Sequence, residues 1–326
     1  MPELLGKVVR SGKLTATTDT TDASSKSDVI AIIVPTLIDH HKKPDYRHVE
    51  EACFDIGKGI RAGSLVIFQS TCGPGVTDRL VKATIEKYSG LKAGQDFGIA
   101  YSPIRAMGGQ VVPDMRKYAR VVGAIDKTSL DVAVAVLSCI VDGKLIKTRD
   151  IPTAEASKLF ETIYRDVSIA LANEFALFCE EARIDYIEAM KAANSQQYSH
   201  LLLPGVGVGG HCLPVYPYLL AAETEKEKLR IPMGSRRTND QMPNHVLRLA
   251  AEGLRTCGKS LKRSRFAVLG ITYRPNVKET RLSPSIELVG LIRKRGGRIS
   301  VYDPLYTQDE LKRMGYHAEP TLPGAL

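Results

Sequence analysis

The 326-residue sequence lacks three features, and each absence excludes a class of protein. It has no apolar run near the ~20 residues that a membrane-spanning helix needs. It has no N-terminal segment that resembles a signal peptide. Its six cysteines stand singly, without a C-x-x-C pair or a histidine at zinc-ligand spacing. We therefore expect a cytoplasmic protein without a metal site, a disulfide framework or membrane insertion.

Positive charge is in excess, since the formal net charge is +9. The lysines and arginines are spread along the sequence rather than gathered in one run. A solvated surface is the simplest explanation, and we expect no nucleic-acid partner. A small ligand that carries phosphate groups suits this charge better.

The first half of the sequence alternates strand and helix patterns. Short β-branched or apolar runs predict buried strands, and amphipathic segments between them predict helices. Such an alternation is typical of a doubly wound, parallel sheet with helices on both faces. The predicted strands cover residues 29–35, 65–70, 97–102 and 118–123, and the helices cover 45–62 and 76–88.

The second half begins with long helices over 153–193, where apolar residues recur at 159, 163, 167 and 171. Strands at 263–271 and 298–304, with a helix at 287–295 between them, restart the α/β pattern. The fold class is therefore α/β, with two Rossmann-like parallel-sheet domains joined by a central helical domain.

The predicted domains are 1–149, 150–258 and 259–326, and we expect both outer domains to be incomplete. A helix-like stretch stands where a first strand would be, and the last residues stop where an α/β domain usually continues. The polar segment 19–27 is predicted to be a surface connection.

A glycine-rich loop ending in a cysteine is the clearest chemical signal: Pro204-Gly-Val-Gly-Val-Gly-Gly-His-Cys-Leu-Pro. Residues 205–210 match G-x-G-x-x-G, but Pro204 precedes them and Pro214 and Pro217 follow where a helix should start. The glycines could instead bring backbone N–H groups close to a ligand or oxyanion, with the Cys212 thiolate as nucleophile. A tight turn around a buried, inert cysteine is the other interpretation, and the residues alone leave both open.

The string at 207–217 resembles the active-site loop of the UDP-glucose/GDP-mannose dehydrogenases, the nucleotide-sugar 6-dehydrogenases. Further blocks match this family in order over nearly the whole chain. They are Val34-Pro-Thr, Gln69-Ser-Thr-Cys-Gly-Pro-Gly, Tyr101-Ser-Pro-Ile-Arg-Ala, Glu155-Ala-Ser-Lys-Leu, Tyr164-Arg-Asp, Ala172-Asn-Glu, the block 236–243 and the block 270–281.

The resemblance implies an enzyme that oxidises the sugar C6 alcohol to a carboxylate with two hydride transfers to NAD. Cys212 matches the family nucleophile, which captures the aldehyde and then forms a thioester. Lys158 matches the lysine that stabilises the developing oxyanion. A histidine before the cysteine, with Pro-Val after it, is more similar to the branch that acts on UDP-N-acetylhexosamines, with UDP-N-acetylmannosamine as the expected substrate.

The resemblance also assigns binding residues and a homodimer built on the central helices. The cofactor-binding positions are Val34, Pro35, Thr36, Ser70, Thr71 and Arg281. The substrate-binding positions are Thr162, Tyr198, Gly207, Gly209, Gly210 and Arg274.

Several functional positions depart from the family pattern. The glycine-rich unit that starts the family's cofactor domain has no counterpart before residue 29. Side chains also differ where the family has a catalytic or binding residue: Gln69, Ile104, Thr162, Tyr198, Tyr216 and Arg274. The alternative function is therefore an inactive relative that binds a sugar nucleotide or a partner subunit.

Overall fold

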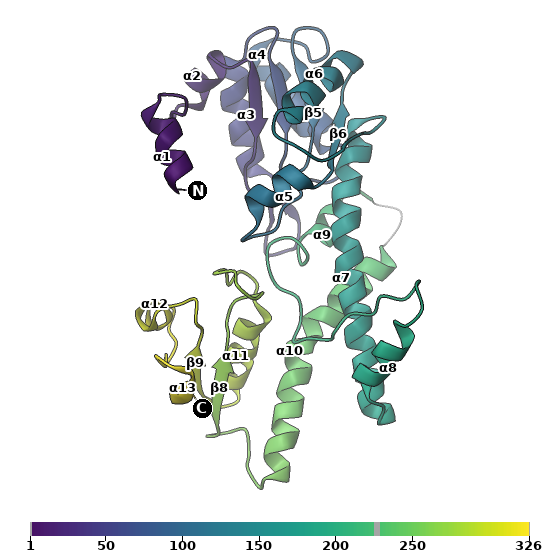
Figure 1. Ribbon diagram of the computed structural model, residues 1–326, viewed down its shortest axis with the longest axis vertical. Coiled ribbons are helices and arrows are strands. Elements are labelled where there is room, and N and C mark those ends of the chain that lie inside the picture. The colour runs from purple at the N-terminus through teal and green to yellow at the C-terminus, as the bar shows by residue number, and fades with distance from the viewer. Residues whose placement is uncertain (1, 225–228, 326) are drawn as a thin grey trace. The chain divides into compact units, whose positions relative to one another are not determined.

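The computed structural model describes residues 2–224 and 229–325, which form two compact units (Figure 1). The first unit contains the described parts of 1–37, 44–106 and 112–158, and the second contains those of 38–43, 107–111 and 159–326. The predicted three-domain boundaries stay a prediction. Among the described helices, none is long and apolar enough to cross a membrane.

The first unit is built on a five-stranded sheet with the order β1-β4-β5-β6-β7. Four of these strands confirm the sequence prediction. The pair β5–β6 is antiparallel, however, so the sheet is mixed rather than wholly parallel. A parallel pair needs a crossover that returns the chain to the opposite end of the sheet, and the link through α5 makes no such return. The strands are β1 (Val29–Ile32), β4 (Leu65–Phe68), β5 (Gly98–Tyr101), β6 (Arg120–Ala124) and β7 (Leu145–Lys147).

Strand β4 is buried along its whole length because both faces of the sheet are covered. Its residues alternate between two apolar clusters: Val66 and Phe68 join the cluster of α3 and α4, while Leu65 and Ile67 join the cluster of α6. A continuous apolar run is the sequence pattern that such a two-sided burial requires. The helices of this unit are α1 (Pro2–Arg10), α2 (Thr20–Ser25), α3 (Arg47–Gly59), η1 (Thr77–Lys82), α4 (Ala83–Ser89), α5 (Val111–Lys117) and α6 (Lys127–Ser138).

Helix α2 corrects the expectation of an irregular connection over 19–27. The Asp19 carboxylate accepts a hydrogen bond from the backbone N–H of Asp22 at 2.8 Å, which is an N-cap interaction. The polar composition concealed a short helix, because Asp, Ser and Thr are as common at helix starts as in loops. Two short strands follow β1 in the chain, β2 (Leu37–Ile38) and β3 (Pro44–Asp45).

The second unit is mainly helical. Helix α7 (Ile151–Ala182) begins in the first unit and supplies the central helix of the second, followed by α8 (Tyr186–Ala193), α9 (Tyr216–Ala221) and α10 (Arg230–Thr256). The residues of the predicted apolar stripe, 159, 163, 167 and 171, do not all have the same environment. Leu159 and Ile163 are buried and pack with Val215 and Leu219 of their own unit, whereas Leu171 is exposed. Its first half therefore builds the unit's own core.

The last part of the second unit is a two-stranded parallel sheet of β8 (Arg265–Leu269) and β9 (Arg298–Tyr302). Helix α11 (Pro284–Lys294) connects the strands, and α12 (Gln308–Arg313) and α13 (Leu322–Ala325) follow them. Ile292, Val301 and Leu311 are buried in their shared core. This β-α-β arrangement confirms the predicted pattern.

Candidate active site

Cys212 lies where the glycine-rich loop meets α9. Its carbonyl accepts hydrogen bonds from the backbone N–H groups of Val215 (3.1 Å) and Tyr216 (2.9 Å), which fixes the turn into the helix. The side chain is half-buried beside Leu159 and Ile163. Cys53, by contrast, is fully buried, and burial raises the pKa of its thiol to about 12. Partial exposure therefore favours a reactive Cys212 over the inert interpretation.

His211 is a candidate functional residue that the sequence prediction missed. Its side chain hydrogen-bonds that of Cys212, and this bond is the main cause that raises the pKa of the His211 imidazole. A thiol and an imidazole in contact can share one proton, which leaves a thiolate beside an imidazolium. The adjacency of the two residues in the sequence is the signal that could have identified this pair.

The loop glycines serve close packing within the second unit. A Cβ atom on Gly209 would lie 2.6 Å from the Leu282 carbonyl oxygen, and one on Gly210 would lie 2.9 Å from the Tyr273 ring. The Gly210 N–H donates to the Arg281 carbonyl at 2.9 Å. The Gly210 N–H therefore has a protein acceptor and is not directed at a ligand or oxyanion.

A buried polar network holds the start of the loop. Asp166, Asn173, Arg236 and Asn239 are each at most 2% exposed. The Arg236 guanidinium donates to the Asp166 carboxylate at 2.5 Å, and the Asn239 amide donates to the same oxygen at 2.9 Å.

The network continues from Asn239 to the loop itself. The Asn173 amide donates to Asn239 at 2.9 Å and accepts from the Gly205 N–H at 2.8 Å. Three family blocks that are separate in the sequence, 164–166, 172–174 and 236–243, therefore contribute to one hydrogen-bond network. Through this network, α7 and α10 together fix the loop that carries Cys212.

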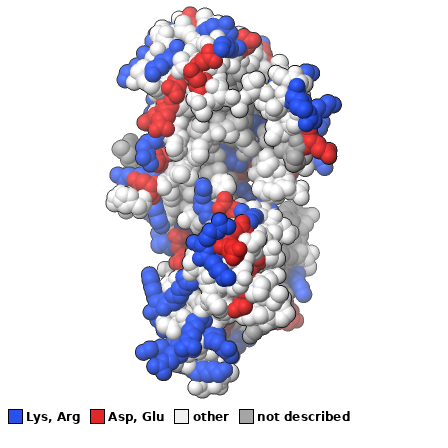
Figure 2. Space-filling model, turned by 90° about the vertical axis from the view of Figure 1, so that its left-hand side faces the viewer, with Lys and Arg blue, Asp and Glu red and all other residues white. Residues whose placement is uncertain are grey.

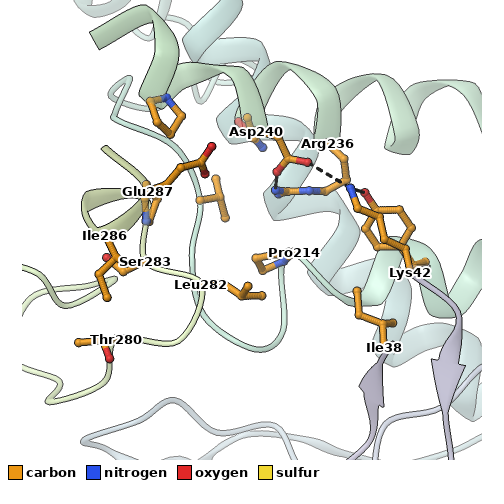
Figure 3. Close-up of a pocket in the computed structure, with 15 residues that line it drawn as sticks. Ile38, Lys42, Pro214, Arg236, Asp240, Thr280, Leu282, Ser283, Ile286 and Glu287 are labelled. Atoms are coloured by element: carbon orange, nitrogen blue, oxygen red, sulfur yellow. Dashed lines mark hydrogen bonds and ion pairs between the residues drawn. The ribbon is translucent and has the colours of Figure 1, made fainter. Parts of the chain in front are cut away.

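A cavity of about 450 Å³ lies beside this loop (Figure 3). Lys42 lies at one side, where its ammonium donates to the Tyr218 hydroxyl at 2.8 Å and pairs with Asp240 at 3.7 Å. Asp240 also pairs with Arg236. Glu287 reaches the opposite side, and burial together with the Asp240 charge raises the pKa of its carboxyl group. The lining also includes Ile38, Val208, Pro214, Asn239, Pro243, Thr280, Leu282, Ser283, Pro284 and Ile286.

The predicted cofactor positions of the first unit meet at one edge of its sheet. The Ser70 hydroxyl accepts from the Val34 N–H at 2.9 Å and donates to the Val34 carbonyl at 2.7 Å, which joins the carboxyl ends of β1 and β4. Ligands of open α/β sheets bind at this edge. The predicted cofactor positions at this edge, 34–36, 70 and 71, suit one part of a dinucleotide but do not include a site for its pyrophosphate. Described residues 2–28 form two helices and no strand, so a strand–glycine turn–helix unit for the pyrophosphate is not among them.

Lys158 is only 8% exposed, which excludes a solvated lysine on an open helix face. On the same helix, the fully buried Glu155 accepts hydrogen bonds from the N–H (2.9 Å) and hydroxyl (2.6 Å) of Thr77 and from the Cys72 thiol (3.2 Å). Burial raises the pKa of Glu155, and the bonds from Thr77 oppose that shift. Lys158 belongs to the first unit and Cys212 to the second, and their predicted joint role stays a prediction.

The departures from the family pattern occupy different environments. Thr162 and Tyr216 are buried, Ile104 is half-buried, and Tyr198 is 85% exposed, so nothing within its own unit covers the Tyr198 ring.

Gln69, another of these departures, accepts a hydrogen bond from the buried Arg120 guanidinium at 3.1 Å. Burial lowers the pKa of Arg120. The Arg120 guanidinium donates to Gln69 and Ser102, and both of these acceptors are neutral.

The sheet and the loop define a class: a nucleotide-binding protein of Rossmann type with a candidate nucleophilic cysteine. Its sequence matches three domain models of one family, described as NAD binding (residues 1–140), central (152–241) and UDP binding (267–323). The chain belongs to the UDP-glucose/GDP-mannose dehydrogenase family, whose members are NAD-dependent nucleotide-sugar dehydrogenases.

Individual relatives agree with this assignment. The UDP-N-acetyl-D-mannosamine dehydrogenase of Pyrococcus horikoshii is 34% identical over 95% of this chain and 73% of its own length. That of Methanocaldococcus jannaschii is 35% identical over 87% of this chain and 64% of its own length. The solved P. horikoshii structure has a TM-score of 0.87 and covers 92% of this chain and 71% of that one. This chain therefore spans about two thirds to three quarters of these relatives.

Proposed function

We propose that this chain works as an NAD-dependent dehydrogenase that oxidises the C6 alcohol of UDP-N-acetylmannosamine to the carboxylate. The observation that carries the proposal is the half-buried Cys212, hydrogen-bonded to His211, in a chain of this family. Support for the substrate comes from the relatives, because those of P. horikoshii and M. jannaschii are named for this sugar nucleotide.

NAD, when bound, accepts the hydride of each of the two oxidations. The residues that would hold its nicotinamide half are Val34, Pro35, Thr36, Ser70 and Thr71. Arg281 would supply a positive charge to the cofactor. The UDP-sugar would lie against the glycine loop, at Gly207, Gly209 and Gly210, with Thr162, Tyr198 and Arg274.

Cys212 performs the covalent steps. His211 takes the thiol proton, and the thiolate sulfur forms a bond to the C6 aldehyde while the carbonyl electron pair moves to oxygen. Lys158 balances the developing negative charge on that oxygen. After the second oxidation, water adds to the thioester carbon, the C–S bond breaks, and the thiolate leaves. One water is consumed and Cys212 is restored.

We also propose that the chain forms a homodimer through an exposed apolar face of α7. Phe160, Tyr164, Leu171, Phe175 and Phe178 are 41–68% exposed and recur at intervals of three, four and seven residues, which places them along one face of the helix. A contiguous exposed apolar face of this kind usually marks a contact surface. A reducing cytoplasm suits the six free cysteines.

The function is tested by following NADH formation with UDP-N-acetylmannosamine and, separately, UDP-N-acetylglucosamine. We expect turnover with the first, none in Cys212→Ser, and full turnover in the control Cys257→Ser, whose thiol is exposed at the end of α10. Absence of both NADH formation and saturable NAD binding would refute the dehydrogenase and leave the inactive relative.

A further inference from the structure

The fold gathers basic side chains that the sequence keeps apart. One run, from Arg255 to Arg274, has no acidic residue, and neither has a second run over 288–302. The structure joins the two runs: Arg265 pairs in register with Arg298, and the Arg263 N–H donates to the Gly296 carbonyl at 2.9 Å. Both runs thus reach the same end of the β8–β9 sheet.

We call the resulting surface the basic end. Lys and Arg predominate at the lower end of the face shown in Figure 2, with few acidic side chains among them. All its members are exposed, and the ion pairs of the described residues include only one of them, Arg255 with Glu252 at 3.9 Å. The basic end consists of Arg255, Lys259, Lys262, Arg263, Arg265, Arg293, Lys294, Arg295 and Arg298.

Helix termini explain only part of this charge. Cations in the last turn of a helix stabilise its negative end, and Arg255, Arg293 and Lys294 have that position in α10 and α11. Lys259 and Lys262 lie in the turn after α10, outside any helix. Neither lysine has an ion-pair partner among the described residues, and their like charges repel, which makes an anionic partner the expected source of compensation.

We propose that the basic end docks this protein on an anionic lipid surface, without insertion. Four of its cations, Lys259, Lys262, Arg263 and Arg295, lie in the two turns that precede β8 and β9, and the hydrogen bond from Arg263 to Gly296 holds these turns side by side. Its cations come from two turns, two helix ends and two strand ends, rather than from the length of one helix that could enter a nucleic-acid groove. None of the aromatic side chains of the two runs is exposed, so the surface offers no stacking platform for bases. Such a surface fits lipid headgroups better than a nucleic acid.

The proposal is tested by sedimenting the full chain with vesicles of phosphatidylcholine alone or mixed with phosphatidylglycerol. We expect binding only to the mixed vesicles, with loss of binding near 1 M salt, where the Debye length falls to about 3 Å. Reversing two charges in Lys259→Glu/Lys262→Glu should lower the partition coefficient by about 30-fold or more, since each surface cation contributes a factor of about five.

The matched control is Lys117→Glu/Lys144→Glu, which makes the same charge change at two exposed lysines of the first unit. It should retain most of the binding. Equal loss in both variants, no binding to the mixed vesicles at low salt, or binding to duplex DNA or RNA in place of vesicles would each overturn the proposal. The measurement is independent of NAD turnover, so it fails or succeeds separately from the proposed function.

Discussion

Replacement of His211 by asparagine should slow the reaction of Cys212 with electrophiles at neutral pH. The thiolate that raises the pKa of His211 is stabilised in return by the imidazolium, because the coupling between two titrating groups is reciprocal. The His211 side chain is exposed, so solvent screening reduces this coupling. We therefore expect the midpoint of alkylation to move to higher pH, with a fall of about tenfold at most in the rate near pH 7.

The pH dependence of the alkylation rate is set by the protonation states of His211 and Cys212. Imidazolium and thiolate attract each other at pH values between the two apparent pKa values of the pair. Above the raised pKa of His211 the imidazole is neutral, and the advantage disappears. The variant and the parent should thus differ most near neutral pH and converge in alkaline solution.

The assay is the rate of iodoacetamide labelling of Cys212 over a range of pH, read by mass spectrometry of its peptide. A background with Cys139→Ser and Cys257→Ser removes the two thiols that are more exposed than Cys212. The control is His317→Asn, which removes an exposed imidazole remote in sequence. Identical pH profiles for His211→Asn and its parent would refute the pairing, and so would an equal shift in the control.

Three further predictions concern the framework of the protein. Tyr164→Glu/Phe178→Glu should convert the proposed homodimer to a monomer in analytical ultracentrifugation, because both side chains belong to the exposed apolar face of α7. Leu159 is buried and is not part of this face. Glu155→Ala should lower the free energy of unfolding, measured by urea titration, by about 3 kcal/mol or more, because it leaves the buried donors of Thr77 without an acceptor. The control is Glu174→Ala at an exposed position, and an equally small effect of both substitutions would contradict this prediction. Gln69→Glu should stabilise the fold by ~1 kcal/mol, since a charged acceptor for Arg120 roughly doubles the strength of a neutral hydrogen bond; a lower melting temperature would show that the added carboxylate is not compensated.

The sequence predicted the strands well because a two-sided sheet requires continuous apolar runs, as in β4. The sequence did not predict helix α2, because its capping residue Asp19 is of a type equally common in loops. It also did not predict that β6 runs antiparallel to β5, because the direction of a strand is set by the connection that precedes it. The family blocks located Cys212, but not the hydrogen bond to His211. Nor could they reveal that Asp166, Asn173 and Asn239 meet, since those residues come from two helices far apart in the chain.

Pro243 has a mechanical consequence for α10. Proline has no N–H, so the carbonyl of Asn239, one turn earlier, has no helical donor. The half of α10 before this point is fixed to α7 by the Arg236–Asp166 pair, and the half after it is fixed to α7 by the pair of His245 with Glu180 at 3.0 Å. Helices bend most easily where a ladder bond is missing. Any bend of α10 is therefore expected at Pro243, between two separate anchors on α7.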